Sequence, residues 1–188
     1  MKRIILGIFL GILAFAAQAQ LTTDLQVVPT SNMTPLVNQL FSGCNQLVSV
    51  QSTGNMMARG SFTNGMNAIG LDHGIILSTG KISDAATPNF NGSTFYNYFG
   101  AGDPVLANAL GYTGTNSDAC AINITFVAQG DIMSLRYVFA SEGYEYDYTG
   151  QGKPEGCGIF VSGPNPAGGT YTSQNIALVP RWNNSCVY

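Results

Sequence analysis

The sequence predicts an all-β fold, a β-sandwich or jelly-roll-like domain with two short helices. Three observations support this class. Apolar and polar residues alternate with a period of two in several short runs, and Gly, Pro, Asn and Ser separate these runs. Helix-start signals occur at only two places. Short alternating segments spaced by turn residues are typical of sandwiches and jelly rolls.

The clearest strands are predicted at residues 122–127 and 135–140, where every second residue is a large apolar one. Gln129, Gly130 and Asp131 lie between them and favour a hairpin turn. Four further segments have β composition and turn residues at both ends: 46–51, 74–79, 157–162 and 175–179.

One helix is predicted to begin at Pro104, because Asp103 supplies an N-cap carboxylate and proline suits the first turn. A second short helix is expected over 35–41, behind Thr34 and ending at Gly43. Segments 52–70 and 80–102 are rich in Gly, Asn, Ser and Thr without an apolar period, so we expect long surface loops there.

The first nineteen residues have the pattern of a signal peptide. Lys2 and Arg3 precede an apolar run over 4–17, and the small residues Ala17 and Ala19 form a signal-peptidase site. The run is shorter than the roughly twenty residues that a membrane-spanning helix needs. We therefore expect a signal peptide over 1–19, cleavage between Ala19 and Gln20, and an exported domain over 20–188.

The composition excludes nucleic acid as a partner. Charged residues make up 9% of the chain, against roughly 25% in an average soluble protein. Two of the seven basic residues lie in the leader, which leaves five basic and ten acidic residues in the mature chain. Phosphate binding requires clustered Lys and Arg.

An even number of cysteines in an exported chain favours one or two disulfides, although buried thiols are an alternative. There is no Cys-x-x-Cys pair and a single histidine, which argues against a zinc site. The pairing is not readable from the sequence. The disulfide candidates are Cys44, Cys120, Cys157 and Cys186.

No catalytic residue is predicted. The chain contains no Gly-x-Ser-x-Gly or His-Glu-x-x-His motif and no phosphate-binding glycine loop with a lysine. His73 is the single imidazole, and its place between Asp72 and Gly74 is typical of a turn. The interpretation as a non-enzyme follows from this lack of a catalytic constellation.

Four carboxylates follow the strand predicted at 135–140, and three tyrosines alternate with them. Three interpretations stay open: a solvated acidic loop, a calcium or ligand site, and the acid and nucleophile of a glycosidase. Calcium would be the only cofactor. The candidate ion ligands are Glu142, Glu145, Asp147 and Glu155, and the candidate sugar-stacking residues are Tyr144, Tyr146 and Tyr148.

Four ordered blocks carry a resemblance to a known family. They are Gly-Ile-Ile-Leu-Ser-Thr-Gly at 74–80, Arg-Tyr-Val-Phe-Ala-Ser-Glu at 136–142, Gly-Ile-Phe-Val-Ser-Gly-Pro at 158–164 and Asn-Ile-Ala-Leu-Val-Pro at 175–180. Together they resemble the choice-of-anchor L domain family over about residues 36–183. The resemblance implies a β-rich bacterial protein that is secreted or at the cell surface, with no established enzymatic activity.

Two departures weaken an ion site inferred by similarity: Glu142-Gly143 stands where the family has paired acids, and Pro154-Glu155 where it has Asn-Asp. The family domain also continues through further strands. The resemblance therefore implies an incomplete domain, whose outer-membrane attachment would use a C-terminal region absent here.

The function expected from these observations is that of an exported, non-catalytic cell-surface module with an adhesive, structural or ligand-binding role. Its partners would be surface glycans or extracellular proteins. The alternative from a different class is a carbohydrate-active enzyme or a carbohydrate-binding accessory module. A third possibility is a structural spacer without a ligand.

Overall fold

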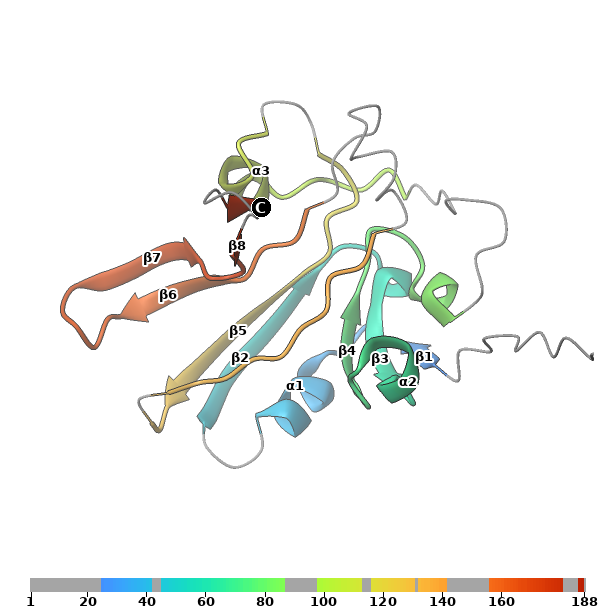
Figure 1. Cartoon of the computed structure of the whole chain (residues 1–188), viewed down its shortest axis with the longest axis horizontal. Helices are drawn as coiled ribbons and strands as arrows, with labels where there is room; N and C mark the ends of the chain where they lie inside the picture. The colour runs from blue at the N-terminus through green and yellow to red at the C-terminus, as the bar shows by residue number, and fades with distance from the viewer. Residues whose placement is uncertain are drawn as a thin grey trace, which may run out of the picture.

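The computed structural model describes residues 25–41, 45–86, 98–112, 116–130, 132–141, 156–180 and 186–187. The described strands all pair in antiparallel fashion, and the helices are short, so the predicted all-β class is confirmed (Figure 1). Within the described part of the chain no helix is long and apolar enough to cross a membrane.

A three-stranded sheet contains β1 (Gln26–Pro29), β3 (Arg59–Thr63) and β4 (Gly74–Leu77), with β3 in the centre. β1 and β3 pair with Val28 opposite Ser61, and β3 and β4 pair with Ser61 opposite Ile75. The 3₁₀ helix η1 (Met56–Ala58) leads into β3. The helix α2 (Met66–Ile69) lies between β3 and β4 in sequence.

The longest pairing joins β2 (Asn45–Thr53) to β5 (Ala121–Ala128). β5 confirms the strand predicted at 122–127, including its alternation, because Ile122, Ile124 and Phe126 are half-buried and the residues between them are exposed. The rings of Phe126 and Phe41 are in contact, with centroids 5.1 Å apart. Phe41 directly follows the helix over residues 34–40. The contact therefore connects the C-terminal end of that helix to the paired strands β2 and β5, which we call the β2–β5 ribbon.

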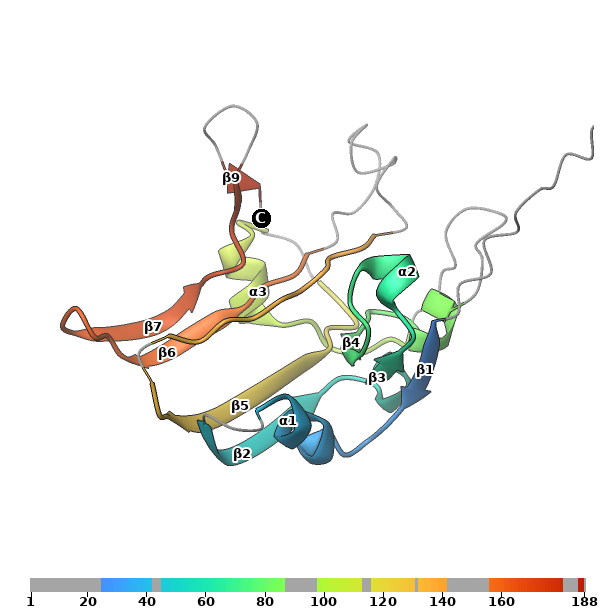
Figure 2. The ribbon, with the colours of Figure 1, turned by 60° about the horizontal axis from the view of Figure 1, so that its bottom comes forward.

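Two smaller antiparallel pairs complete the described sheets (Figure 2). The hairpin of β6 (Phe160–Pro164) and β7 (Thr170–Asn175) extends from one side of the molecule. β8 (Val179–Pro180) pairs with β9 (Cys186–Val187). The strand predicted at 157–162 corresponds to β6, which begins later than expected, at Phe160. The strand predicted at 175–179 was wrong, because the Asn175 side chain accepts hydrogen bonds from the Ile159 and Ala177 backbone N–H groups and turns the chain.

Both predicted helices are present. In α3 (Pro104–Ala109), Asp103 Oδ1 accepts hydrogen bonds from the Val105 and Leu106 N–H groups at 2.8 and 2.9 Å. These two bonds at the start of α3 satisfy backbone N–H groups that have no partner within the helix. The other predicted helix, α1 (Thr34–Leu40), begins one residue earlier than expected.

The core lies around the three-stranded sheet and not around the longer β2–β5 ribbon. It is built where the 3₁₀ helix η2 (Ile82–Ala86) contacts β1 and η1, and where α1 contacts β2 and β4. Among the described residues, the fully buried side chains are those of Met33, Val37 and Ile82, and the other buried apolar residues are Leu25, Ala58, Phe62 and Ala177. This core stabilises the three-stranded sheet and the helices that pack on it, which we call the scaffold. The other described segments extend from the scaffold.

The prediction of a loop over 52–70 was wrong, because this segment contains the central strand of the sheet. Gly60 lies where β1 passes so close that a Cβ would collide with the Val28 carbonyl oxygen. Strand β3 therefore needs glycine at position 60, where it packs tightly against β1. This glycine is one of the Gly, Asn, Ser and Thr residues that made the segment resemble a loop in the sequence.

Candidate interaction surface

The predicted acidic and tyrosine residues lie outside the described residues, so their roles remain predictions. These residues are Glu142, Tyr144, Glu145, Tyr146, Asp147, Tyr148 and Glu155. The cleavage site at Ala19 and Gln20 also lies outside them. Within the described ranges, no three His, Cys, Asp or Glu residues lie close enough together to hold a metal ion.

The disulfide prediction does not hold for two of the four cysteines. Cys120 and Cys157 are both free thiols. Cys120 interacts with the Arg59 side chain and the Ser78 backbone instead of with a second sulfur. The side chains of Cys44 and Cys186 fall outside what the structure describes.

Neither free thiol lies in an environment that activates cysteine. Burial raises the pKa of Cys120, and the nearby Arg59 guanidinium acts against this rise without overcoming it. Burial alone raises the pKa of Cys157. Because the thiolate is the nucleophilic form, a raised pKa makes both thiols less reactive at neutral pH than an ordinary cysteine.

Arg59 has a structural role next to Cys120. Its side chain is buried, and Nη1 donates hydrogen bonds to the carbonyl oxygens of Thr53 and Gly54 at 3.0 and 2.7 Å. These bonds fix the corner where the chain leaves β2 and enters β3. Arg59 therefore connects the β2–β5 ribbon to the three-stranded sheet.

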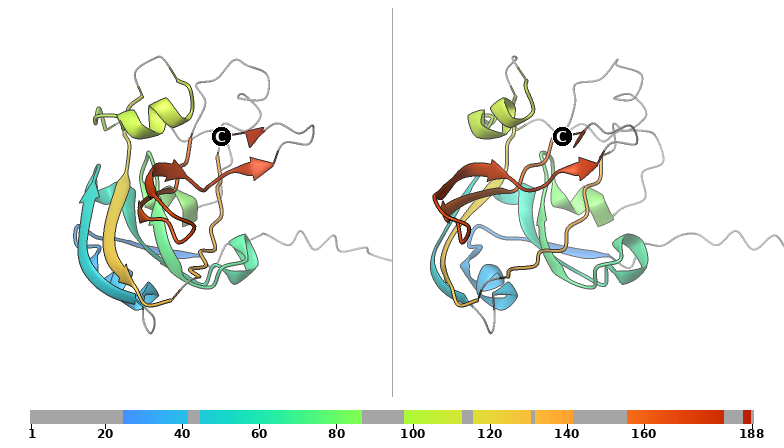
Figure 3. Two further views of the ribbon diagram at one scale, coloured as in Figure 1. Left: turned by 90° about the vertical axis from the view of Figure 1, so that its left-hand side faces the viewer. Right: turned by 60° about the vertical axis from the view of Figure 1, so that its left-hand side comes forward.

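The most distinctive surface feature is residues 132–140, which we call the 132–140 segment. It was predicted to be a strand at 135–140, and this prediction was wrong: among the described residues no strand pairs with it. After the bend at Gln129 and Gly130 the segment separates from β5, as Figure 3 shows, so the expected hairpin ladder does not form.

Large apolar side chains dominate this segment and face solvent. Their exposed fractions range from 44% to 89%. An apolar cluster of this size on one short stretch of chain exceeds the scattered single residues that are normal on protein surfaces. The six side chains are those of Ile132, Met133, Leu135, Tyr137, Val138 and Phe139.

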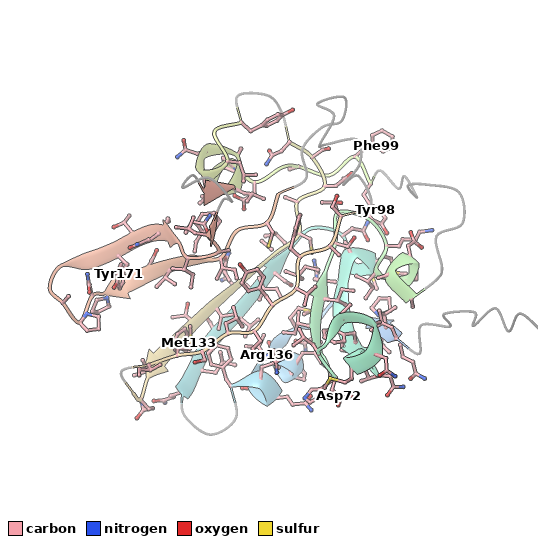
Figure 4. All side chains as sticks on the ribbon, viewed as in Figure 1. Asp72, Tyr98, Phe99, Met133, Arg136 and Tyr171 are labelled. Atoms are coloured by element: carbon pink, nitrogen blue, oxygen red, sulfur yellow. The ribbon has the colours of Figure 1, made fainter. Side chains whose placement is uncertain are left out.

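One side-chain hydrogen bond connects the 132–140 segment to the scaffold. Arg136 Nη2 donates to the Gly70 carbonyl oxygen at 3.3 Å. Gly70 ends α2 in a left-handed conformation, with φ of 71°. Figure 4 places Arg136 and Met133 on the segment. An exposed bond of this length orients the segment more than it stabilises it.

Phe99 is a further exposed aromatic side chain, and it lies in a constrained turn outside the 132–140 segment. Phe99 is 89% exposed, has φ of 54°, and points away from the molecule in Figure 4. Asp118 holds this turn, because its two carboxylate oxygens accept hydrogen bonds from the Tyr98 and Gly100 N–H groups at 3.1 and 2.7 Å. Sequence reasoning missed this turn, since an aromatic residue with positive φ gives no signal in a single sequence.

The described residues form antiparallel sheets and an exposed apolar segment, and exposed apolar patches of this kind mark interaction sites. The chain belongs to the choice-of-anchor L domain family, whose model matches residues 24–187. It is therefore a cell-surface-associated or secreted protein in general terms. The family is one of surface modules and not a known enzyme family. No curated protein and no solved structure matches the chain.

Proposed function

We propose that the chain is an exported, non-catalytic surface module that binds an extracellular protein through its 132–140 segment, in adhesion or in an extracellular structure. The single observation that carries this proposal is the exposure of six large apolar side chains on that segment. Removing such a surface from water is the dominant favourable term in most protein association.

The chemistry of the segment fits a protein partner better than a soluble sugar. It contains no carboxylate or amide side chain, the groups that give a sugar site its polar contacts. Its backbone is extended and lacks a strand partner among the described residues, which allows another chain to pair with it. Family membership and the leader support a location where such partners occur.

Retention of the mature chain on immobilised extracellular proteins, with matrix proteins and the mature chain itself as the immobilised partners, tests this function. Replacing Leu135 with Asn should lower retention at least tenfold, because it puts an amide in the middle of the apolar surface. Val28→Thr is the matched control, since Val28 is also exposed, at 62%, but lies on β1. Equal retention of both variants and the parent chain would refute the proposed role of the segment.

A further inference from the structure

We propose that the partner of the 132–140 segment is the same segment of a second copy, and that the two segments form an antiparallel pair around a twofold axis at Leu135. This inference rests on the proposed function and names the partner of the same surface. A twofold dimer brings one patch against itself, so the patch must be complementary to itself.

The exposed apolar area supports a small, reversible dimer. Counted over whole residues, the exposed fractions of the six residues amount to roughly 700 Å² per copy, against about 800 Å² per partner in a standard interface. Side chains alternate between the two faces of an extended chain, so an edge-to-edge pair covers only part of this area, and the contact belongs to the small class of protein–protein interfaces.

The sequence of the segment suits pairing with itself in one register. With Leu135 opposite its own copy, Met133 faces Tyr137, and both pairs are apolar. Ile132 faces Val138 on the other side of the ribbon, and Ser134 faces Arg136, so every large apolar side chain from 132 to 138 meets another apolar side chain. Cross-strand pairs of this kind stabilise antiparallel sheets.

The neighbouring register is disfavoured by charge. An axis at Arg136 would place two guanidinium groups opposite each other, which is destabilising. In the register centred on Leu135, Arg136 lies beside a serine and keeps its bond to Gly70. Position 136 therefore disfavours the register that is centred on it.

The overall charge of the chain does not oppose this contact. Each mature copy has an excess of acidic residues, but the segment itself contains no Asp or Glu. Two copies can therefore approach along it without bringing carboxylates together. Its single cation is already hydrogen-bonded to the scaffold.

The oligomeric state of the mature chain tests the inference, and sedimentation velocity measures it. Chain concentrations from about 1 to 100 μM cover the dissociation constants expected of a small, reversible dimer. We expect a dimer that Leu135→Lys weakens at least about 100-fold, because it places two ammonium groups at the axis. Val28→Lys, the control on β1, should leave the dimer intact. Circular dichroism checks that both variants fold.

Disulfide trapping provides a second measurement that does not depend on the lysine variant. Cys157 is an exposed free thiol, so the trapping uses a Cys157→Ser background. In that background Leu135→Cys should form covalent dimers under mild oxidation, and Val28→Cys and the background chain itself should not. A parent chain that stays monomeric up to 100 μM, or equal trapping at both positions, overturns the inference. If that monomer still loses matrix retention on Leu135→Asn, the proposed function stands and only the identity of the partner was wrong.

Discussion

Replacing Phe62 with Ala is expected to lower the free energy of unfolding by about 3–5 kcal/mol, a large part of the total stability of a small domain. Phe62 is 5% exposed and lies on the central strand β3. Its ring packs against the backbone at Gly65 and Gly74, where an added Cβ would lie 3.0 and 2.9 Å from ring carbons. The cavity left by the ring could not be filled by neighbouring side chains.

Phe99→Ala is the matched control for this prediction. Phe99 is the same residue type at 89% exposure, so its replacement should change stability by no more than about 0.5 kcal/mol. Urea unfolding followed by circular dichroism measures both variants. Similar midpoints for the two would show that the core does not lie around β3.

Gly60→Ala is the second substitution for which we expect a large effect, a loss of about 1–3 kcal/mol in the free energy of unfolding. Its Cβ would collide with the Val28 carbonyl oxygen and would lie 2.7 Å from Ile82 Cδ1. The first neighbour is backbone, so strand β1 would have to move away from β3. That movement would weaken the pairing that places Pro29 opposite Gly60.

Gly130→Ala is the control for Gly60, because nothing lies within 4 Å of a Cβ at position 130. Thermal unfolding should show a clear decrease in melting temperature for Gly60→Ala and almost none for Gly130→Ala. A Gly60→Ala variant as stable as the parent chain would mean that β1 and β3 are not packed as closely as described.

Local signals predicted the elements that depend on local chemistry. Asp103 and Pro104 predicted α3, because the cap and the first turn are made by adjacent residues. Alternation predicted β5, whose two faces differ in burial from Ile122 to Val127. In both cases the residues that form the sequence pattern are the same residues whose hydrogen bonds or burial stabilise the element.

Elements that depend on distant contacts could not be predicted in this way. β3 resembled a loop because its segment is rich in Gly, Asn, Ser and Thr and lacks an apolar period. The close approach of β1 that requires Gly60 is not revealed by any neighbouring residue. The 132–140 segment has the apolar residues of a strand, but a strand also requires a partner. Pairing is a property of the tertiary structure, so the composition of one segment cannot determine it.

The surface that the structure shows directly precedes, in the chain, the residues that the sequence singled out. Sequence reasoning chose the acids and tyrosines after Ser141, which lie outside the described residues. The described surface that suits binding is the apolar segment before Ser141, first interpreted as part of a buried sheet. The Phe99 turn had no signal at all, because its presentation depends on two hydrogen bonds to the Asp118 carboxylate.

Amide hydrogen exchange of the 132–140 segment tests the central claim of an open binding surface most directly. In the dilute mature chain, where copies do not meet, these amides should exchange at least about 100-fold faster than those of β5, because unpaired backbone opens without unfolding. They should become protected when a partner covers the segment. Protection equal to that of β5 in the dilute chain would contradict the account, since it would show a strand already paired within the domain.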